Sequence, residues 1–386
     1  MTSSQSSENL ASPWSPAPKG LEGVVVANTM ISKIDGKAGK LVYRGYDIQD
    51  LAGNIPFEGV AFLLWVGHLP NPLEFDTFKK NLGEHRNIAA DVKIFLESAP
   101  HEADPMSVLR TAVSIIGLRP SNEDSILEDG LNLVSQFPSI LSHYQRTRNE
   151  EEIIAPRNDL GHAANYIYML TGELPNKKHE HALDSYFTLL SDHGMNASTF
   201  SARVTISTLT DIYSAIVSAI GTLKGPLHGG APSKVWEMLQ EIEKPENASA
   251  WLKERLANNE RIMGFGHRIY KTEDPRSKIL KKLAKENADP DIFALATTVE
   301  TEARKLLQAE HPKRPLDTNV EFYSSLVLNA VGIPTDMFTS TFACARAFGW
   351  IAHIMEQLAD NRMFRPNSEY VGPLDLRVPE VWRTKN

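Results

Sequence analysis

Two histidines lie in segments whose backbone could hold a small ligand. His193 is in Asp192–Thr199, directly before a helix rich in small residues, and Ser198 is available there as a helix cap. Helix N-termini attract anions through their free N–H groups. His228 precedes two glycines in Lys224–Pro232, and glycine lets the backbone approach a ligand closely. Taken singly, a helix cap and a glycine-rich turn explain these segments equally well.

A basic segment and an acidic helix start follow along the chain. Gly264–Lys271 contains His267, and Arg276 comes shortly after it, a density of cationic side chains that suits a phosphate or carboxylate ligand. Glu321 lies in Thr318–Tyr323, where apolar and aromatic neighbours would partly desolvate its carboxylate and raise its basicity. A solvated basic loop and a glutamate favoured by the helix dipole are the alternatives.

Two arginines stand out nearer the C-terminus. Arg346 interrupts an apolar helix face, where an unpaired charge is costly, so it needs an anionic partner. Arg365 lies in a loop after the same helix. A salt bridge within the protein is the alternative explanation for each.

The ordered set of these segments resembles the citrate synthase family. The matching segments are Tyr43–Ile48, His228–Ala231, Gly264–Arg276, Asn319–Tyr323, Arg346–Gly349 and Arg365-Pro366. The resemblance runs from about Gly20 to the C-terminus, and the order of the segments makes it far more specific than any one motif. It implies an acyltransferase that condenses acetyl-CoA with oxaloacetate and then hydrolyses the thioester to citrate and CoA.

The resemblance leaves two other functions open. 2-Methylcitrate synthase uses propionyl-CoA with the same residues, and one extra methylene discriminates between substrates by only about 1–3 kcal/mol. A catalytically silent CoA-binding or scaffold protein with the same fold is the second alternative. Comparing the two thioesters as substrates separates the first alternative, and an assay of CoA release separates the second.

The family's residue roles carry over to the matching positions of this chain. The resemblance implies that His228 donates to the thioester carbonyl, that Glu321 removes the methyl proton and that His267 donates to the oxaloacetate carbonyl. The residues implied to bind oxaloacetate are His193, Arg276, Arg346 and, from the partner subunit, Arg365. Those implied to contact CoA are Ile262, Gly264, Gly266, Lys271 and Lys278.

One position departs from the family pattern. The family's usual base is aspartate, and Glu321 stands at that position here. Charge and acid–base type are kept, but the reach grows by one methylene, so the backbone or a domain closure must compensate. Asp317, four residues upstream, is the fallback base.

The elements that must position these residues are mostly helical. Val24–Ile34 and Lys40–Tyr43 flank a glycine-containing turn and predict a β-hairpin. The predicted helices are Phe57–Val66, Leu73–Leu82, Ala89–Ser98, Pro105–Ile116, Ser125–Tyr144, His181–Ser191, Thr199–Leu223 and Pro334–Asp360. Strands and helices do not alternate, so we expect an all-α, two-domain citrate synthase-like fold with a small N-terminal hairpin.

The charge pattern predicts how the domains are divided. Lys and Glu become dense after residue 233, which predicts a small helical domain at 230–333 inserted between 20–229 and 334–386 of a large one. Residues 1–19 are rich in Ser and Pro and predict a disordered tail. Closure of the two domains after oxaloacetate binds would exclude water, so we expect oxaloacetate to bind first.

Composition excludes several classes of protein. The chain has 386 residues and a net charge of −8, which argues against a nucleic-acid partner. Its one cysteine, Cys344, rules out a disulfide within the chain and a multi-thiolate metal site, and we interpret it as a core residue. Ile212–Leu223, the longest apolar stretch, is too short for a bilayer, which takes about 20 residues. His179 and His181 point apart on a helix, so no metal site is expected.

These observations predict a cytoplasmic protein without a membrane partner. No cofactor is expected, because acetyl-CoA is a substrate. The resemblance implies a homodimer, since sites of the family borrow an arginine across the two-fold axis, and it leaves assembly beyond the dimer open.

Overall fold

The computed structural model describes residues 18–119, 126–267, 269–312 and 316–383. Residues 29–363 form one compact unit, and the described parts of 1–28 and 364–386 belong to a second. The regular elements of this second unit are two short 3₁₀ turns, Lys19–Leu21 and Glu380–Trp382. The tail predicted at 1–19 lies outside the described residues except for its last two positions.

The small sheet lies at the start of the first unit. Strand β1 (Ser32–Asp35) pairs antiparallel with β2 (Lys40–Tyr43), which pairs with β3 (Tyr46–Asp47). The predicted hairpin is therefore confirmed, although its first strand begins at Ser32 and not at Val24. The reason is the length of β2. Tyr43 pairs with Ser32, the Arg44 N–H donates to the Ile31 carbonyl at 2.8 Å, and the chain then turns away through Gly45 at φ 96°, so residues before Ile31 have no strand to pair with.

Sixteen α-helices follow within the described residues. The first eight are α1 (Ile48–Leu51), α2 (Phe57–Val66), α3 (Pro72–Glu84), α4 (Ala90–Ser98), α5 (Pro105–Ile116), α6 (Ile126–Arg148), α7 (His162–Thr171) and α8 (Lys177–Leu190). The others are α9 (Ala197–Ile206), α10 (Ile212–Leu223), α11 (Ala231–Ile242), α12 (Ala248–Ala257), α13 (Pro275–Asn287), α14 (Pro290–Glu310), α15 (Val320–Ala330) and α16 (Phe338–Ala359). The predicted all-α class with a minor sheet is confirmed.

The long helix predicted at Thr199–Leu223 is wrong: it is two helices, α9 and α10. Leu209 takes a positive φ of 63°, which reverses the chain, and Asp211 restarts it as the cap of α10 by accepting from the Ser214 N–H at 2.7 Å. The two helices lie side by side, with the hydroxyls of Ser201 and Ser218 2.5 Å apart. The small residues do allow a neighbouring helix to approach closely, but in the structure that neighbour is the other half of the same segment: α9 packs against α10.

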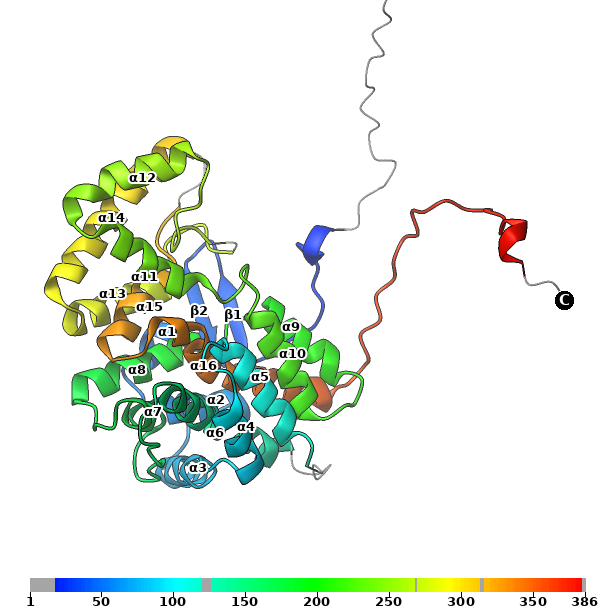
Figure 1. Ribbon diagram of the computed structural model, residues 1–386, viewed down its shortest axis with the longest axis horizontal. Helices are drawn as coiled ribbons and strands as arrows, with labels where there is room; N and C mark the ends of the chain where they lie inside the picture. The colour runs from blue at the N-terminus through cyan, green and yellow to red at the C-terminus, as the bar shows by residue number, and fades with distance from the viewer. Residues whose placement is uncertain (1–17, 120–125, 268, 313–315, 384–386) are drawn as a thin grey trace, which may run out of the picture. The chain divides into compact units, whose positions relative to one another are not determined.

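Helix α16 is the centre of the first unit. It is buried along most of its length and packs against α2, α5, α6, α8, α9, α10 and α11. Helices α11 to α15 pack against one another and gather on one side of the labelled elements (Figure 1). They span the range assigned to a small domain, and that division stays a prediction. No helix in the described part of the chain is long and apolar enough to cross a bilayer.

Candidate functional site

The turn that carries His193 ends in the cap of α9. Asn196 is the cap, because its side chain accepts from the Thr199 N–H at 3.1 Å. Ser198, which the sequence offered as the cap, has another partner: its hydroxyl lies 2.9 Å from Nε2 of His228 and accepts from the indole N–H of Trp350 at 3.1 Å. Ser198 therefore orients a histidine of the predicted site.

His228 is held as a neutral ring. The Ser198 N–H donates to Nε2 of His228 at 3.3 Å, so Nε2 is an acceptor and Nδ1 carries the proton. Burial, together with the nearby charge of Arg346, lowers the pKa of His228 to about 4. At neutral pH His228 is thus an uncharged donor with a defined tautomer.

His267 is fixed in the opposite tautomer. Its Nδ1 accepts from the N–H groups of Ile269 and Tyr270 at 3.0 and 3.1 Å, so the proton is on Nε2. Burial and Arg276 lower the pKa of His267 to about 4. The ring of His193 lies 5.3 Å from that of His267, centroid to centroid, and its Nε2 is 3.3 Å from the Tyr270 hydroxyl.

Backbone pairing joins the His267 segment to the start of α15. Phe265 and Thr318 form an antiparallel bridge, and the Asn319 N–H donates to the carbonyl of Gly264 at 2.9 Å. Gly264 has φ 83°, and a Cβ there would lie 2.7 Å from the ring of Phe322. A larger residue at 264 would therefore separate the two segments.

Glu321 lies in the first turn of α15, which is capped by Asn319. Burial raises the pKa of Glu321, although Arg276 opposes the rise. Its Oε2 is buried and has no hydrogen-bond partner among the described residues. The carboxylate of Asp317, the fallback base, is paired with Arg304 at 2.8 Å. Glu321 is therefore the better placed of the two carboxylates to accept a proton.

The two buried arginines differ in their partners. Arg276 pairs bidentately with Asp274, with Nε–Oδ1 and Nη2–Oδ2 distances of 3.0 and 2.7 Å. Arg346 donates from Nε to the carbonyl of Leu190 at 2.8 Å, and its guanidinium lies 4.7 Å from the centre of the Phe342 ring. Among the described residues no carboxylate oxygen lies within 4 Å of Arg346. Burial lowers the pKa of Arg346 to about 10, and the negative charge of Asp192 makes the largest opposing contribution.

The two arginines link all the other predicted residues of the cluster electrostatically. Arg276 acts on His193, His267 and Glu321, and Arg346 acts on His193, His228 and Glu321. Six side chains that span positions 193 to 346 thus lie near one another, His193, Arg276 and Arg346 buried and the other three half-buried. Arg365 is exposed and belongs to the second unit, so its role stays a prediction.

The five residues predicted to contact CoA fall into two groups. Ile262 is buried, and Gly264 and Gly266 take positive φ angles that shape the loop before His267. Lys271 and Lys278 are exposed, and Lys278 lies 3.5 Å from Glu273. Their proposed contacts with CoA stay predictions. The described residues contain no group of three His, Cys, Asp or Glu side chains that could hold a metal ion.

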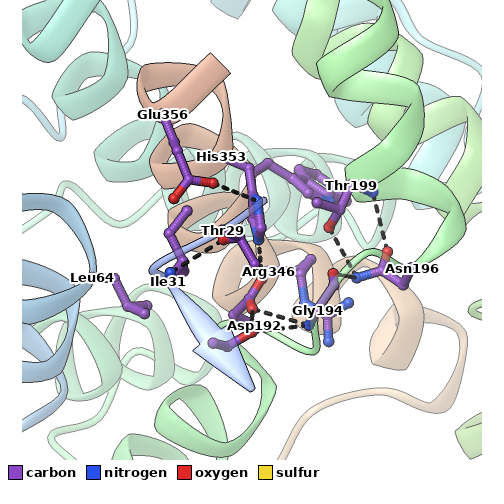
Figure 2. A network of polar contacts seen from close by, with 12 residues as sticks. Thr29, Ile31, Leu64, Asp192, Gly194, Asn196, Thr199, Arg346, His353 and Glu356 are labelled. Carbon is purple, nitrogen blue, oxygen red and sulfur yellow. Dashed lines mark hydrogen bonds and ion pairs between the residues drawn. The ribbon is translucent and has the colours of Figure 1, made fainter. Parts of the chain in front are cut away.

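Sequence reasoning missed the residues that support this cluster. Tyr270 contacts two of the histidines, and Asp274 both caps α13 and pairs with Arg276. Asp192 and His353 are both buried, and Nε2 of His353 lies 3.1 Å from Oδ1 of Asp192, the residue before His193 (Figure 2). Only the Asp274 cap had a local signal, an Asp before Pro-Arg, whereas the Asp192–His353 contact depends on the fold.

Known proteins resemble this chain over most of its length. A family model described as "Citrate synthase, C-terminal domain" matches residues 20–367. The citrate synthase of Acidithiobacillus ferridurans is 44% identical over 382 residues, covering 95% of this chain and 98% of that protein. A 2-methylcitrate synthase of Corynebacterium glutamicum is 39% identical, covering 94% and 97%.

Solved structures agree with these sequence matches. The crystal structure of citrate synthase from Thermotoga maritima is 40% identical with a TM-score of 0.85, covering 95% of this chain and 99% of that one. Citrate synthase from Thermoplasma acidophilum, in ternary complex with carboxymethyl coenzyme A and oxaloacetate, is 30% identical with a TM-score of 0.88 and the same coverage.

Proposed function

Because the chain belongs to the citrate synthase family, we propose that it condenses acetyl-CoA with oxaloacetate and releases citrate and CoA. The observation that carries the proposal is the cluster of these six side chains. It combines a carboxylate whose Oε2 has no hydrogen-bond partner among the described residues, two neutral histidines with defined tautomers, and two buried arginines. Each is a group that this condensation needs.

The first step is removal of a proton from the thioester methyl group. Glu321 accepts the proton, and the electron pair moves to the carbonyl oxygen, where the Nδ1–H of His228 donates to it. A thioester α-proton is too weakly acidic for an ordinary carboxylate, so the enolate must be stabilised as it forms. A fixed donor contributes roughly 3–4 kcal/mol to such a step, and the raised pKa of Glu321 makes it a stronger base.

The second step joins the enol carbon to the ketone of oxaloacetate. The Nε2–H of His267 donates to the ketone oxygen as the new carbon–carbon bond forms. His193, Arg276 and Arg346 hold the two carboxylates of oxaloacetate. Arg346 suits this role because its guanidinium is buried without a carboxylate partner in the described structure. Water then hydrolyses the citryl thioester and releases CoA.

A closure of two domains completes the proposal. The range 230–333 carries His267 and Glu321, while Arg346 lies in the other domain, so closure assembles the site. Oxaloacetate then binds first and organises the acetyl-CoA site. Calorimetry should find that acetyl-CoA binds more tightly when oxaloacetate is present, and equal affinities would reject this order.

We further propose a homodimer in which the partner subunit supplies Arg365. The described residues that follow Arg365 expose many large apolar side chains, an arrangement typical of a protein contact. They are Tyr370, Val371, Leu374, Leu376, Val378, Val381 and Trp382. An Arg365→Ala protein that stays dimeric and keeps normal oxaloacetate affinity would remove the role of Arg365. The cytoplasmic location stays a prediction.

A coupled assay of CoA release tests the main proposal. The wild-type protein should release CoA from acetyl-CoA only when oxaloacetate is present. Propionyl-CoA tests the second candidate, 2-methylcitrate synthase, which the similarity to the Corynebacterium glutamicum protein keeps open. A higher kcat/KM for propionyl-CoA than for acetyl-CoA would favour that activity.

A further inference from the structure

Asp192 is a fully buried carboxylate that receives hydrogen bonds from three different parts of the fold. The Ser32 hydroxyl of β1 and the Gly194 N–H, at 3.0 Å, donate to Oδ2. Nε2 of His353 on α16 lies 3.1 Å from Oδ1 (Figure 2). Burial alone would raise the pKa of Asp192, but the contacts with His353 hold it below its usual value.

The hydrogen bond at the second ring nitrogen of His353, Nδ1, determines its tautomer. Nδ1 of His353 lies 3.2 Å from Nη1 of Arg203, and an arginine can only donate. Nδ1 is therefore an acceptor, and the proton sits on Nε2 and points at Asp192. Arg203 is itself held by Glu356 at 2.6 Å and by Gln357 at 3.0 Å.

Helix α16 brings this pair next to the predicted oxaloacetate site. Arg346, Gly349 and His353 follow one another at spacings of three and four, so they share a face of the helix. A Cβ at Gly349 would lie 2.1 Å from the carbonyl oxygen of Ser191 and 2.9 Å from Oδ1 of Asp192. The missing side chain thus lets the turn before His193 rest directly on the helix that carries Arg346.

This placement gives Asp192 two competing donors, the Nε2–H of His353 and the guanidinium of Arg346. It acts electrostatically on Arg346, yet its oxygens are directed to His353, Ser32 and Gly194. A carboxylate that lost the His353 bond would gain most by turning to Arg346, because buried charges seek a hydrogen-bonded partner. It would then occupy the guanidinium that a substrate carboxylate needs.

We infer that His353 is a positioning residue for oxaloacetate: it holds Asp192 away from Arg346 and keeps Arg346 available to the substrate. The inference rests on the proposed function, and it adds a residue that does not touch the substrate. The Arg203–Glu356 pair supports it by fixing the ring of His353 in the donating tautomer.

Variants of His353 test the inference by direct calorimetric titration with oxaloacetate. His353→Leu should weaken oxaloacetate binding about tenfold to a hundredfold, as expected when a hydrogen bond to a charge is lost. At saturating oxaloacetate its KM for acetyl-CoA should be unchanged. His353→Gln should bind nearly as the wild type, because its amide can both donate to Asp192 and accept from Arg203.

A double variant separates positioning from general damage to the fold. In His353→Leu/Asp192→Asn the neutral amide does not compete for Arg346, so oxaloacetate affinity should recover at least tenfold relative to His353→Leu. Tyr166→Phe is the matched control, because it removes a buried hydrogen bond of 3.0 Å to Thr341 on the same helix. It should leave oxaloacetate binding unchanged while lowering stability.

Several results would overturn the inference. They are wild-type affinity in His353→Leu, a double variant that binds no better than His353→Leu, or equal loss in Tyr166→Phe. Should His353→Leu fail to fold, weak binding by a folded His353→Gln would reject the inference. A wild-type protein that binds oxaloacetate but releases no CoA would reject only the proposed function, whereas no binding at all would reject both.

Discussion

Arg276 and Asp274 at the start of α13 satisfy each other's charge, whereas Glu321 on α15 and Arg346 on α16 have no ion-pair partner among the described residues. Arg276 and Asp274 are both buried and form two hydrogen bonds to one another. Among the described residues Arg346 donates only to a backbone carbonyl, and Oε2 of Glu321 has no hydrogen-bond partner. We call Arg276 and Asp274 the closed pair, because each satisfies the other in the folded protein. We call Arg346 and Glu321 the open groups, because a bound ligand would supply the partners that they lack. Substitutions should therefore lower both stability and substrate binding in the first region, and lower function without loss of stability in the second.

The largest expected effect is on the open carboxylate. Glu321→Gln should lower kcat by about 10²–10⁴-fold, because positioned acid–base catalysis supplies a factor of that size. The free energy of unfolding should stay the same or rise, since an unpaired buried carboxyl is removed. Steady-state kinetics and urea unfolding measure the two quantities.

A paired carboxylate nearby is the control for this substitution. Glu300 is buried and accepts from the Tyr323 hydroxyl of α15 at 2.6 Å. Glu300→Gln should lower stability and leave kcat nearly unchanged. Turnover little altered in Glu321→Gln would show that the base lies elsewhere.

The closed pair should respond in the opposite way. Arg276→Leu leaves Asp274 buried without its partner, so the free energy of unfolding should fall by about 3–5 kcal/mol. The double variant Arg276→Leu/Asp274→Leu should regain most of that loss, yet oxaloacetate binding should stay weak in both. A double variant that is no more stable than the single one would contradict the idea of a self-contained pair.

The open arginine provides the matched comparison. Arg346→Leu should weaken oxaloacetate binding by about 2–3 kcal/mol, as expected for lost hydrogen bonds to a carboxylate. Its unfolding free energy should be unchanged or higher, because a buried charge without a carboxylate partner is gone. Calorimetric titration and urea unfolding check both parts, and a loss of stability equal to that of Arg276→Leu would erase the distinction between the two regions.

The smallest effect should come from a buried histidine outside the site. Both ring nitrogens of His162 lack partners in the described structure, and the ring packs against Phe57, Phe187 and Phe348. Burial lowers the pKa of His162 to about 3 from its usual 6.5. The unfolded chain therefore takes up a proton as the pH falls below 6.5, whereas the folded protein does not until about pH 3, so His162 makes stability rise with pH across that window.

The pH dependence of stability therefore tests His162, a buried group without a hydrogen-bond partner in the described structure that has no proposed role in ligand binding. Between pH 7 and pH 5 the unfolding free energy of His162→Leu should fall by about 2 kcal/mol less than that of the wild type. Oxaloacetate affinity at pH 7 should be unchanged. Equal pH dependence in the two proteins would show that His162 is protonated in the fold.

Much of the fold follows from patterns along the chain, because helix periodicity and turn residues are local. The break between α9 and α10 was missed since Ile206 to Ile212 keeps an apolar helical pattern, and only the positive φ of Leu209 interrupts it. The six clustered side chains were identified because chemistry-bearing residues sit beside glycines or helix starts. The sequence around His353 gives no comparable signal, because its contact with Asp192 joins residues 161 positions apart in the chain.

The bridge between Phe265 and Thr318 also determines when His267, the proposed proton donor, gains its orientation during folding. Asn319 and Gly266, which flank this bridge, are 53 residues apart in the chain. His267 therefore leaves the ribosome well before the segment that holds its loop, and closing so long a loop is slow relative to helix formation. His267 and Glu321, the proposed proton donor and base, therefore become ordered in the same docking event, and a partly folded chain has neither in place.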